Sequence, residues 1–282
     1  MSEAELVRRL DNQVRAAREE VTMYRLMYDG RRGVESLESF ADLPIITNNR
    51  LVNERLEDTL ADFGQICITR TFGDDVERGG YMPRLLNYDD VLREFEVLAF
   101  ITDYAGLKGR HRVMLIADDR HVYTVAEFGK YMAFYGWPLS TFIVREQNTD
   151  ALRTHLARFK PTAVFVDTES EPPVELLPKS VRLLFTFNNP YRHGEPQQEE
   201  GARAYTSFDL FRDPWVGLTA IKSERDAHYT FNPLHYYFES DADGVFTVTS
   251  FVNRLQPVIR YSVRHGAAGT GVDTFAFRPE HA

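Results

Sequence analysis

The fold is decided by residues 112–166, which read RVMLIADDRHVYTVAEFGKYMAFYGWPLSTFIVREQNTDALRTHLARFKPTAVFV. This stretch holds three short apolar runs typical of buried strands, separated by two segments with the length and composition of helices. The apolar runs lie at 112–116, 141–144 and 162–166, and the helical segments lie at 122–135 and 149–159. Strands that alternate with helices indicate crossover units, so the sequence predicts an α/β fold with a mainly parallel sheet.

The flanking sequence adds helices on the N-terminal side. Apolar residues recur at helical spacing and predict an amphipathic helix that runs to about Met27, with Ser2 and Glu5 forming a capping box. The apolar stripe is Leu6, Leu10, Val14, Ala17 and Val21. Residues 40–51 predict a turn at Pro44 followed by a second short helix.

The rest of the chain completes the α/β pattern and then changes character. We predict strands at 65–71 and 181–185, a long helix at 88–104, and aromatic-rich strands and turns from about Thr230. Gly244 is expected to close a hairpin there. We therefore expect one domain with three regions: a helical region at 1–60, an α/β core at 61–225, and a small β-rich subdomain near the C-terminus at 226–282.

Composition excludes several classes of protein. The formal charge of −9 and the scattered arginines disfavour nucleic acid as a partner. No window reaches the about 18 uncharged apolar residues that a membrane span needs, so we expect a soluble, cytoplasmic protein without a membrane partner. Cys67 is the single cysteine, which excludes an intramolecular disulfide. The histidines show no HExxH or comparable spacing, and we expect no metal site.

Four stretches together carry a resemblance to a known family. The most specific is HYYFESDADGVFTVTSFVNRLQPVIRYSV at 235–263, and the others are ESFADLPIITNNRL at 38–51, LNYDDVLREFEVLAFITDYAGLKGRHRVMLIA at 86–117 and NTDALRTHLARFKPTAVFV at 148–166. They resemble the phenylacetate-CoA ligase branch of the adenylate-forming superfamily, whose members read His-Tyr-Tyr-Pro-Glu, a hairpin, Thr-Ser-Leu and Pro-Leu-Ile-Arg-Tyr at the first. The resemblance implies the N-terminal domain of an adenylate-forming enzyme.

The phosphate loop of that family departs strongly in this sequence. The family reads Ser-Ser-Gly-Thr-Thr-Gly-Lys-Pro, whereas the matching residues 69–80 read TRTFGDDVERGG. Asp74 and Asp75 replace hydroxyl groups and would repel a polyphosphate, and we expect them to lie in a solvated turn rather than to serve catalysis or bind a metal. The comparison implies that ATP and magnesium binding have been lost.

The adenine and magnesium motifs are altered as well. Phe187, Asn188 and Asn189 stand where the family has a Gly-Ala-Glu-Pro turn that lines the adenine pocket, and Asn-Asn-Pro is also ordinary turn chemistry. Tyr205 to Asp209 match the family's Tyr-Gly-x-Thr-Glu motif. Asp209 could bind a hard cation together with water, or it could cap a helix or face solvent.

The ribose motif completes a vestigial nucleotide pocket. The family's Arg-Tyr-x-Thr-x-Asp is matched by Arg260 and Tyr261, with His265 in place of the Asp. A neutral imidazole accepts only one hydrogen bond, so bidentate capture of a ribose is lost. Arg260 is expected to tie the sheet to a carboxylate, with anion binding as the alternative.

The resemblance also implies that the family's C-terminal lid domain, with its catalytic lysine, is absent. We therefore expect no catalytic residue and no cofactor. Cys67 is expected to be a buried inert thiol, with a thioester-carrying nucleophile as the alternative. The aromatic cluster of Phe231 with residues 236–238 is expected to form core or a dimer surface.

The functional expectation is a pseudoenzyme. It would be an accessory or binding subunit for an acyl thioester, an acyl carrier protein or a partner enzyme in a biosynthetic pathway. A homodimer, or a heterodimer with a full-length homologue, fits this role. The alternative is an enzyme, either an ATP-dependent aryl- or acyl-CoA ligase with its lid supplied in trans, or an ATP-independent acyl transferase between CoA and a carrier protein.

Overall fold

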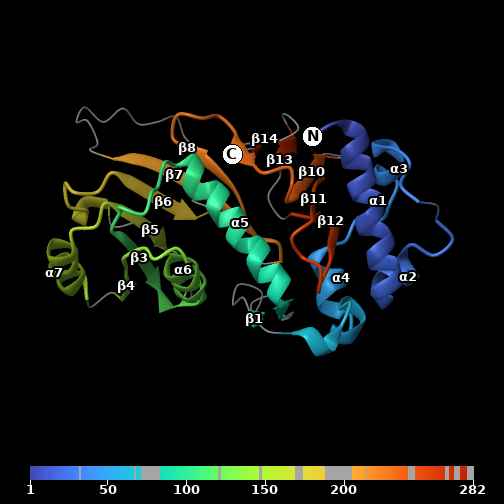
Figure 1. Cartoon of the computed structure of the whole chain (residues 1–282), viewed down its shortest axis with the longest axis horizontal. Helices are drawn as coiled ribbons and strands as arrows, with labels where there is room; N and C mark the ends of the chain where they lie inside the picture. Colours follow the sequence, from blue (N-terminus) through green and yellow to red (C-terminus); the bar gives the residue numbers. More distant parts are fainter. Residues whose placement is uncertain are drawn as a thin grey trace. The chain divides into compact units, whose positions relative to one another are not determined.

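The computed structural model describes most of the chain, in two compact units (Figure 1). Unit 1 comprises Met1–Val97, Asp213–Thr219 and Thr230–Ala282, and unit 2 comprises Leu98–Arg212 and Ala220–Tyr229. The described residues are 1–31, 33–66, 68–70, 83–119, 122–145, 148–168, 174–187, 205–213, 215–240, 245–263, 267–269 and 274–277. Cys67, Asp74, Asp75, Asn188, Asn189, Gly244 and His265 lie outside them, so the expectations placed on these residues stay predictions.

Unit 2 is built on a parallel sheet. Its strands are β3 (Val113–Asp118), β4 (Leu139–Val144), β5 (Ala163–Asp167), β6 (Leu183–Phe187), β7 (Thr206–Asp213) up to Arg212, and β8 (Gly217–Ser223) from Ala220. They lie in the order β8-β7-β6-β5-β3-β4, and each neighbouring pair from β4 to β7 is parallel. The chain passes from β3 to β4 on one side and returns as β5 on the other. The strand order therefore reverses between β3 and β5.

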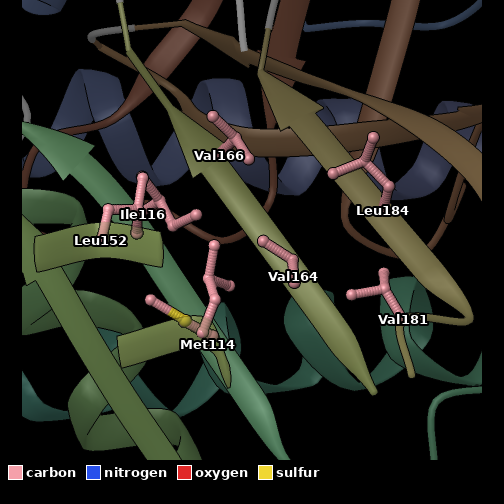
Figure 2. Packing of buried hydrophobic residues seen from close by; sticks show 8 residues of the cluster. Met114, Ile116, Leu152, Val164, Val166, Val181 and Leu184 are labelled. Atoms are coloured by element: carbon pink, nitrogen blue, oxygen red, sulfur yellow. The ribbon is translucent and has the colours of Figure 1, made fainter. Parts of the chain in front are cut away.

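One face of this sheet packs against α7 (Thr149–Phe159). Leu152 and Leu156 are the buried positions of that helix, as expected for an amphipathic stripe. They meet alternate residues of the strands, which point to one face because strand side chains repeat every second residue. Figure 2 shows this cluster, whose buried members are Met114, Ile116, Leu152, Leu156, Val164, Val166, Val181 and Leu184.

The other face carries a stack of phenylalanines. Phe165, Phe185 and Phe208 are direct neighbours on β5, β6 and β7. Their rings stack with centroids 4.1 and 5.2 Å apart. Phe128 of α6 (Val122–Phe134) packs on this stack, 4.8 Å from the Phe165 ring. Both faces are thus mostly apolar, and buried polar side chains such as Asp209 on β7 need hydrogen-bond partners there.

Unit 1 begins with four helices: α1 (Glu3–Glu20), α2 (Thr22–Met27), α3 (Leu37–Ala41) and α4 (Asn48–Asn53). The Ser2 side chain accepts the Glu5 N–H and caps α1 as predicted. The single helix predicted up to Met27 is wrong, because the extended residue Val21 separates α1 from α2. Val21 is fully buried, and its β-branched side chain suits that extended backbone.

The strands of unit 1 are antiparallel. β1 (Ile68–Arg70) pairs with β2 (Arg84–Leu86), and β13 (Ala267–Gly269) pairs with β14 (Thr274–Phe277). β10 (Tyr236–Ser240), β11 (Phe246–Ser250) and β12 (Val258–Ser262) form a three-stranded sheet. The remaining elements are α5 (Tyr88–Tyr104), which runs from unit 1 into unit 2, β9 (Tyr229–Phe231), and 3₁₀ turns at Leu56–Thr59, Phe63–Gln65 and Val174–Leu176.

Several predictions from the sequence are confirmed by these elements. The α/β class, the parallel sheet and the small antiparallel sheet near the C-terminus are all present. Phe231 and Phe238 belong to the core, with ring centroids 4.6 Å apart. Strands β2, β7 and β8 were not predicted. Within the part of the chain that the structure describes, no helix combines the length and apolar character required to traverse a lipid bilayer.

The α7 face gives a stability prediction. We expect Leu152→Ala to destabilise unit 2 by about 2–5 kcal/mol, because it removes buried methyl groups and leaves a cavity. Arg158→Ala on the exposed side of the same helix is the matched control and should change stability by less than about 0.5 kcal/mol. Urea denaturation of both variants measures the difference. Equal effects would contradict the packing described for this face.

Candidate functional site

Polar side chains in unit 2 gather where the parallel strands end. β3 ends at Asp118, β5 at Asp167 and β6 at Phe187, and Arg212 lies near the end of β7. In open α/β sheets, ligands bind outside the carboxyl ends of the strands, near the point where strand order reverses. This carboxyl edge is therefore the first place to look for a site.

Arg212 and Asp167 form a two-pronged ion pair at this edge. Nη1 of Arg212 lies 2.7 Å from Oδ2 of Asp167, and Nη2 lies 3.2 Å from Oδ1. Both side chains are nearly buried, with 10% and 4% exposed. Paired hydrogen bonds of this kind are among the strongest that a guanidinium makes. Each charge is thus matched by the other within the protein.

The ion pair lies against Phe187, the last residue of β6, which is the strand between β5 and β7. The Arg212 guanidinium carbon is 4.9 Å from the centroid of the Phe187 ring, a cation–π distance. Phe128 meets the same ring edge-on at 5.7 Å. Phe187, the one described residue of the predicted adenine turn, is therefore already engaged by two side chains of the protein.

Asp209 is enclosed in the interior of unit 2. It lies in the middle of β7, is 3% exposed, and accepts a hydrogen bond from the Tyr229 hydroxyl. Burial and the neighbouring Asp209 raise the pKa of Tyr229 well above its usual range, so the phenol stays a proton donor. The predicted capping or surface role of Asp209 is wrong, because the carboxylate is buried in the middle of a strand.

The structure separates two residues that the sequence placed in one pocket. Leu183 pairs with Thr206 and Phe187 with Leu210, so Tyr205 lies at the amino end of β7 while Phe187 lies at the carboxyl end of β6. Tyr205 packs against the aliphatic cluster on the α7 face instead. Residues 205–209 match the magnesium motif in sequence, but they do not lie together at the carboxyl edge of the sheet.

Arg260 of unit 1 is bound by protein groups through its Nε and Nη1 atoms. Its Nε donates to Oε1 of Glu239 at 2.5 Å, and its Nη1 donates to the carbonyl oxygens of Ala41 and Leu43. The side chain is buried, and the backbone adopts a φ of 48°, a left-handed conformation unusual for a non-glycine residue. This arrangement corresponds to the structural role expected from the sequence, and it leaves Arg260 little capacity to bind an anion.

His235 opens the stretch that carried the most specific resemblance, and it lies in a cationic setting within unit 1. Its Nε2 is 3.1 Å from Oε2 of Glu96. Burial, with Arg9 and Arg93 nearby, lowers the pKa of His235 to about 4. The contact with Glu96 is therefore a hydrogen bond from a neutral imidazole rather than an ion pair at neutral pH.

Sequence reasoning missed the central pair of the carboxyl edge. Arg212 and Asp167 lie 45 residues apart, and only the sheet brings them together. The feature of the sequence that could have indicated them is their position, since each lies near the end of an apolar strand. Among the described residues, no group of three or more His, Cys, Asp or Glu side chains is placed to hold a metal ion. Of the described carboxylates in this region, Asp167 is paired with Arg212 and Asp209 accepts a hydrogen bond from Tyr229.

Comparison with known proteins identifies the fold. No protein-family model and no curated protein sequence matches the chain. A structure of 2-hydroxyisobutyryl-CoA ligase in an open conformation, in complex with 2-HIB-AMP and CoA, matches with a TM-score of 0.77 and 15% identity over 98% of this chain and 68% of that chain.

More distant structures agree with this match. The o-succinylbenzoate CoA synthetase of Bacillus subtilis matches with a TM-score of 0.55 and 11% identity over 76% of this chain and 48% of that one. A malonyl-CoA ligase matches with a TM-score of 0.52 and 11% identity over 78% and 54%. At these identities the likeness establishes the fold alone, which this chain shares with part of each of these CoA ligases.

The buried pair at the carboxyl edge yields a stability prediction. Arg212→Ala should destabilise unit 2 by about 3 kcal/mol or more, because it leaves the Asp167 carboxylate buried without its guanidinium. Arg145→Ala removes the exposed Arg145–Asp119 pair and should cost less than about 1 kcal/mol. Chemical denaturation of the two variants provides the measurement. A mild effect of Arg212→Ala would mean that the pair is open to water.

His235 predicts a pH dependence of stability. The folded-state pKa lies below the unfolded value near 6.5, so the unfolded chain binds the proton first and stability falls as pH drops below about 6.5. Between about pH 7.5 and pH 5, wild type should lose roughly 2 kcal/mol more than His235→Gln, at about 1.4 kcal/mol per pH unit. Denaturation curves at several pH values test this, and parallel losses would contradict it.

Proposed function

We propose that this chain is a non-adenylating homologue of acyl-CoA ligases that serves as an accessory or binding subunit for an acyl thioester, a carrier protein or a partner enzyme. The observation that carries the proposal is the closed Arg212–Asp167 pair on Phe187. It occupies the carboxyl edge, where folds of this kind receive their ligands.

Adenylation requires free charges of both signs. Phosphate groups need cations or N–H donors, and magnesium needs carboxylate oxygens. Asp167 is matched by Arg212, and Asp209 accepts the hydroxyl of Tyr229. Separating a buried ion pair costs about 3–5 kcal/mol, which a nucleotide would have to supply before binding. This cost supports loss of ATP and magnesium binding.

The sequence of the phosphate loop supports the same proposal. Asp74 and Asp75 lie where hydroxyl-bearing residues are expected, and carboxylates raise the energy of a nearby polyphosphate. These residues lie outside the described part of the chain, so this argument comes from their chemistry alone.

The ligand class that we propose is the acyl thioester. The 2-hydroxyisobutyryl-CoA ligase of similar fold was crystallised with CoA, and the malonyl-CoA ligase with methylmalonyl-CoA. A relative that has lost adenylation but kept this scaffold would still offer a surface for a thioester or for a protein that carries one. Pairing with a full-length homologue is a further part of the proposal.

Binding of adenosine provides a direct test. We expect no saturable heat when the protein is titrated calorimetrically with adenosine, and no pyrophosphate release with ATP, magnesium and a panel of aryl and acyl acids. An active acyl-CoA ligase in the same assays is the positive control. Saturable adenosine binding, or acid-dependent release of pyrophosphate, would overturn the proposal and favour a ligase.

The second part of the proposal has its own measurement. Titration with acyl-CoA and with acylated carrier protein should show saturable binding without turnover, and co-chromatography with a full-length homologue tests a mixed dimer. Transfer of the acyl group that is lost in Cys67→Ala would instead indicate a covalent transferase.

A further inference from the structure

A polar groove lies within unit 1 and belongs to none of the sites discussed so far. Its volume is about 420 Å³, within the range of small-molecule sites. The lining comes from α1, the first part of α5 and the segment between β11 and β12, and includes Arg9, Arg93, Arg254, Gln13 and Phe251.

Hydrogen bonds to the backbone hold these walls in place. Oδ1 of Asp90 accepts the Arg254 N–H at 2.7 Å, which fixes the segment after β11 against the start of α5. Nε2 of Gln13 donates to the carbonyl oxygen of Ser250 at 3.2 Å, which fixes the same segment against α1. The groove is thus formed by anchored elements.

None of the three arginines of the groove forms an ion pair with a carboxylate in the part of the chain that the structure describes. Arg9 donates to the carbonyl oxygen of Leu234 at 2.6 Å, and its guanidinium carbon lies 4.6 Å from the Phe251 ring centroid. Arg93 donates to the carbonyl oxygen of Phe251 at 2.9 Å. The Arg254 side chain makes no hydrogen bond or ion pair with any described residue. A guanidinium has five N–H donors, so most of theirs remain available.

Positive charge is concentrated in this groove, although the chain as a whole carries a net negative charge. Glu20 is the one carboxylate of the lining, which leaves an excess of two positive charges over the three arginines. Burial and the nearby Arg254 lower the pKa of Arg93, partly offset by Asp90, Glu96 and Asp89. Burial, Arg93 and Arg8 lower the pKa of Arg9, partly offset by Glu5. The arginines therefore destabilise one another's charge, and a bound dianion would relieve that repulsion.

We propose that this groove binds a small molecule that carries a phosphate or diphosphate group. Guanidinium groups match the geometry of phosphate oxygens, and two excess positive charges match a dianion better than a monocarboxylate. The Phe251 ring and the neighbouring Ala17 and Pro257 provide an apolar wall for the organic part. The proposal is independent of the proposed function, since it concerns unit 1 alone and involves no adenylation.

Calorimetric titration with pyrophosphate, phosphate, phenyl phosphate and acetate tests this groove. Pyrophosphate should bind saturably, acetate should not, and phenyl phosphate should bind more tightly than phosphate. Arg93→Ala and Arg254→Ala should each weaken pyrophosphate binding about tenfold or more, as expected for loss of a charged hydrogen bond. Arg254 is exposed, so its replacement should leave the fold intact, as circular dichroism would verify.

Arg18→Ala is the matched control. Arg18 lies on the same helix and donates to the carbonyl oxygen of Arg31 without lining the groove, so this variant should bind pyrophosphate like wild type. No saturable binding, or equal loss in all three variants, would overturn the proposal. Acetate binding as tight as phosphate binding would also overturn it. If phenyl phosphate binds no more tightly than phosphate, the proposed apolar wall for the organic part of the ligand is wrong.

The two proposals fail independently. Heat from ATP that disappears in the Arg93→Ala/Arg254→Ala double variant belongs to the groove and supports the phosphate site. Adenosine binding that persists in that variant contradicts the proposed function and leaves the groove untouched.

Discussion

The parallel sheet of unit 2 is mostly apolar on both faces, and this constraint limits where charged side chains can lie without a partner. Aliphatic side chains around α7 fill one face and stacked phenylalanines fill the other. Charged side chains are tolerated near the strand ends, where Asp167 and Arg212 meet. An α/β enzyme would place its ligand at that edge, so a buried ion pair there bears directly on function.

The same constraint explains which elements were predictable. The apolar strands and the helices between them could be read because their periods differ. Residues 88–104 and 149–159 were predicted to the residue, and the second is followed by Lys160 in a left-handed conformation and by Pro161. The break at Val21 was missed, because Val21 continues the apolar stripe of α1 and is buried whether or not the helix is continuous.

The site was harder to predict than the fold because it depends on register. Asp209 was read as part of a linear motif, but its place in mid-strand makes it an interior residue that needs Tyr229 as a partner. Tyr205 lies only four residues earlier, just before the amino end of the strand. A motif match assigns neighbouring residues to the same pocket. Along a strand, however, each residue lies about 3.3 Å farther from the edge than the one before it.

Arginine in this protein occurs in two settings, and the contrast indicates where a ligand is expected. Arg84, Arg212 and Arg260 are buried and paired with Glu94, Asp167 and Glu239. Such pairs offset the cost of taking charge out of water, and they have little affinity left for anything else. Arg9, Arg93 and Arg254 lack a carboxylate partner of this kind. A chain that neutralises its buried arginines elsewhere but leaves three together in one groove retains a local attraction for anions, despite its overall negative charge.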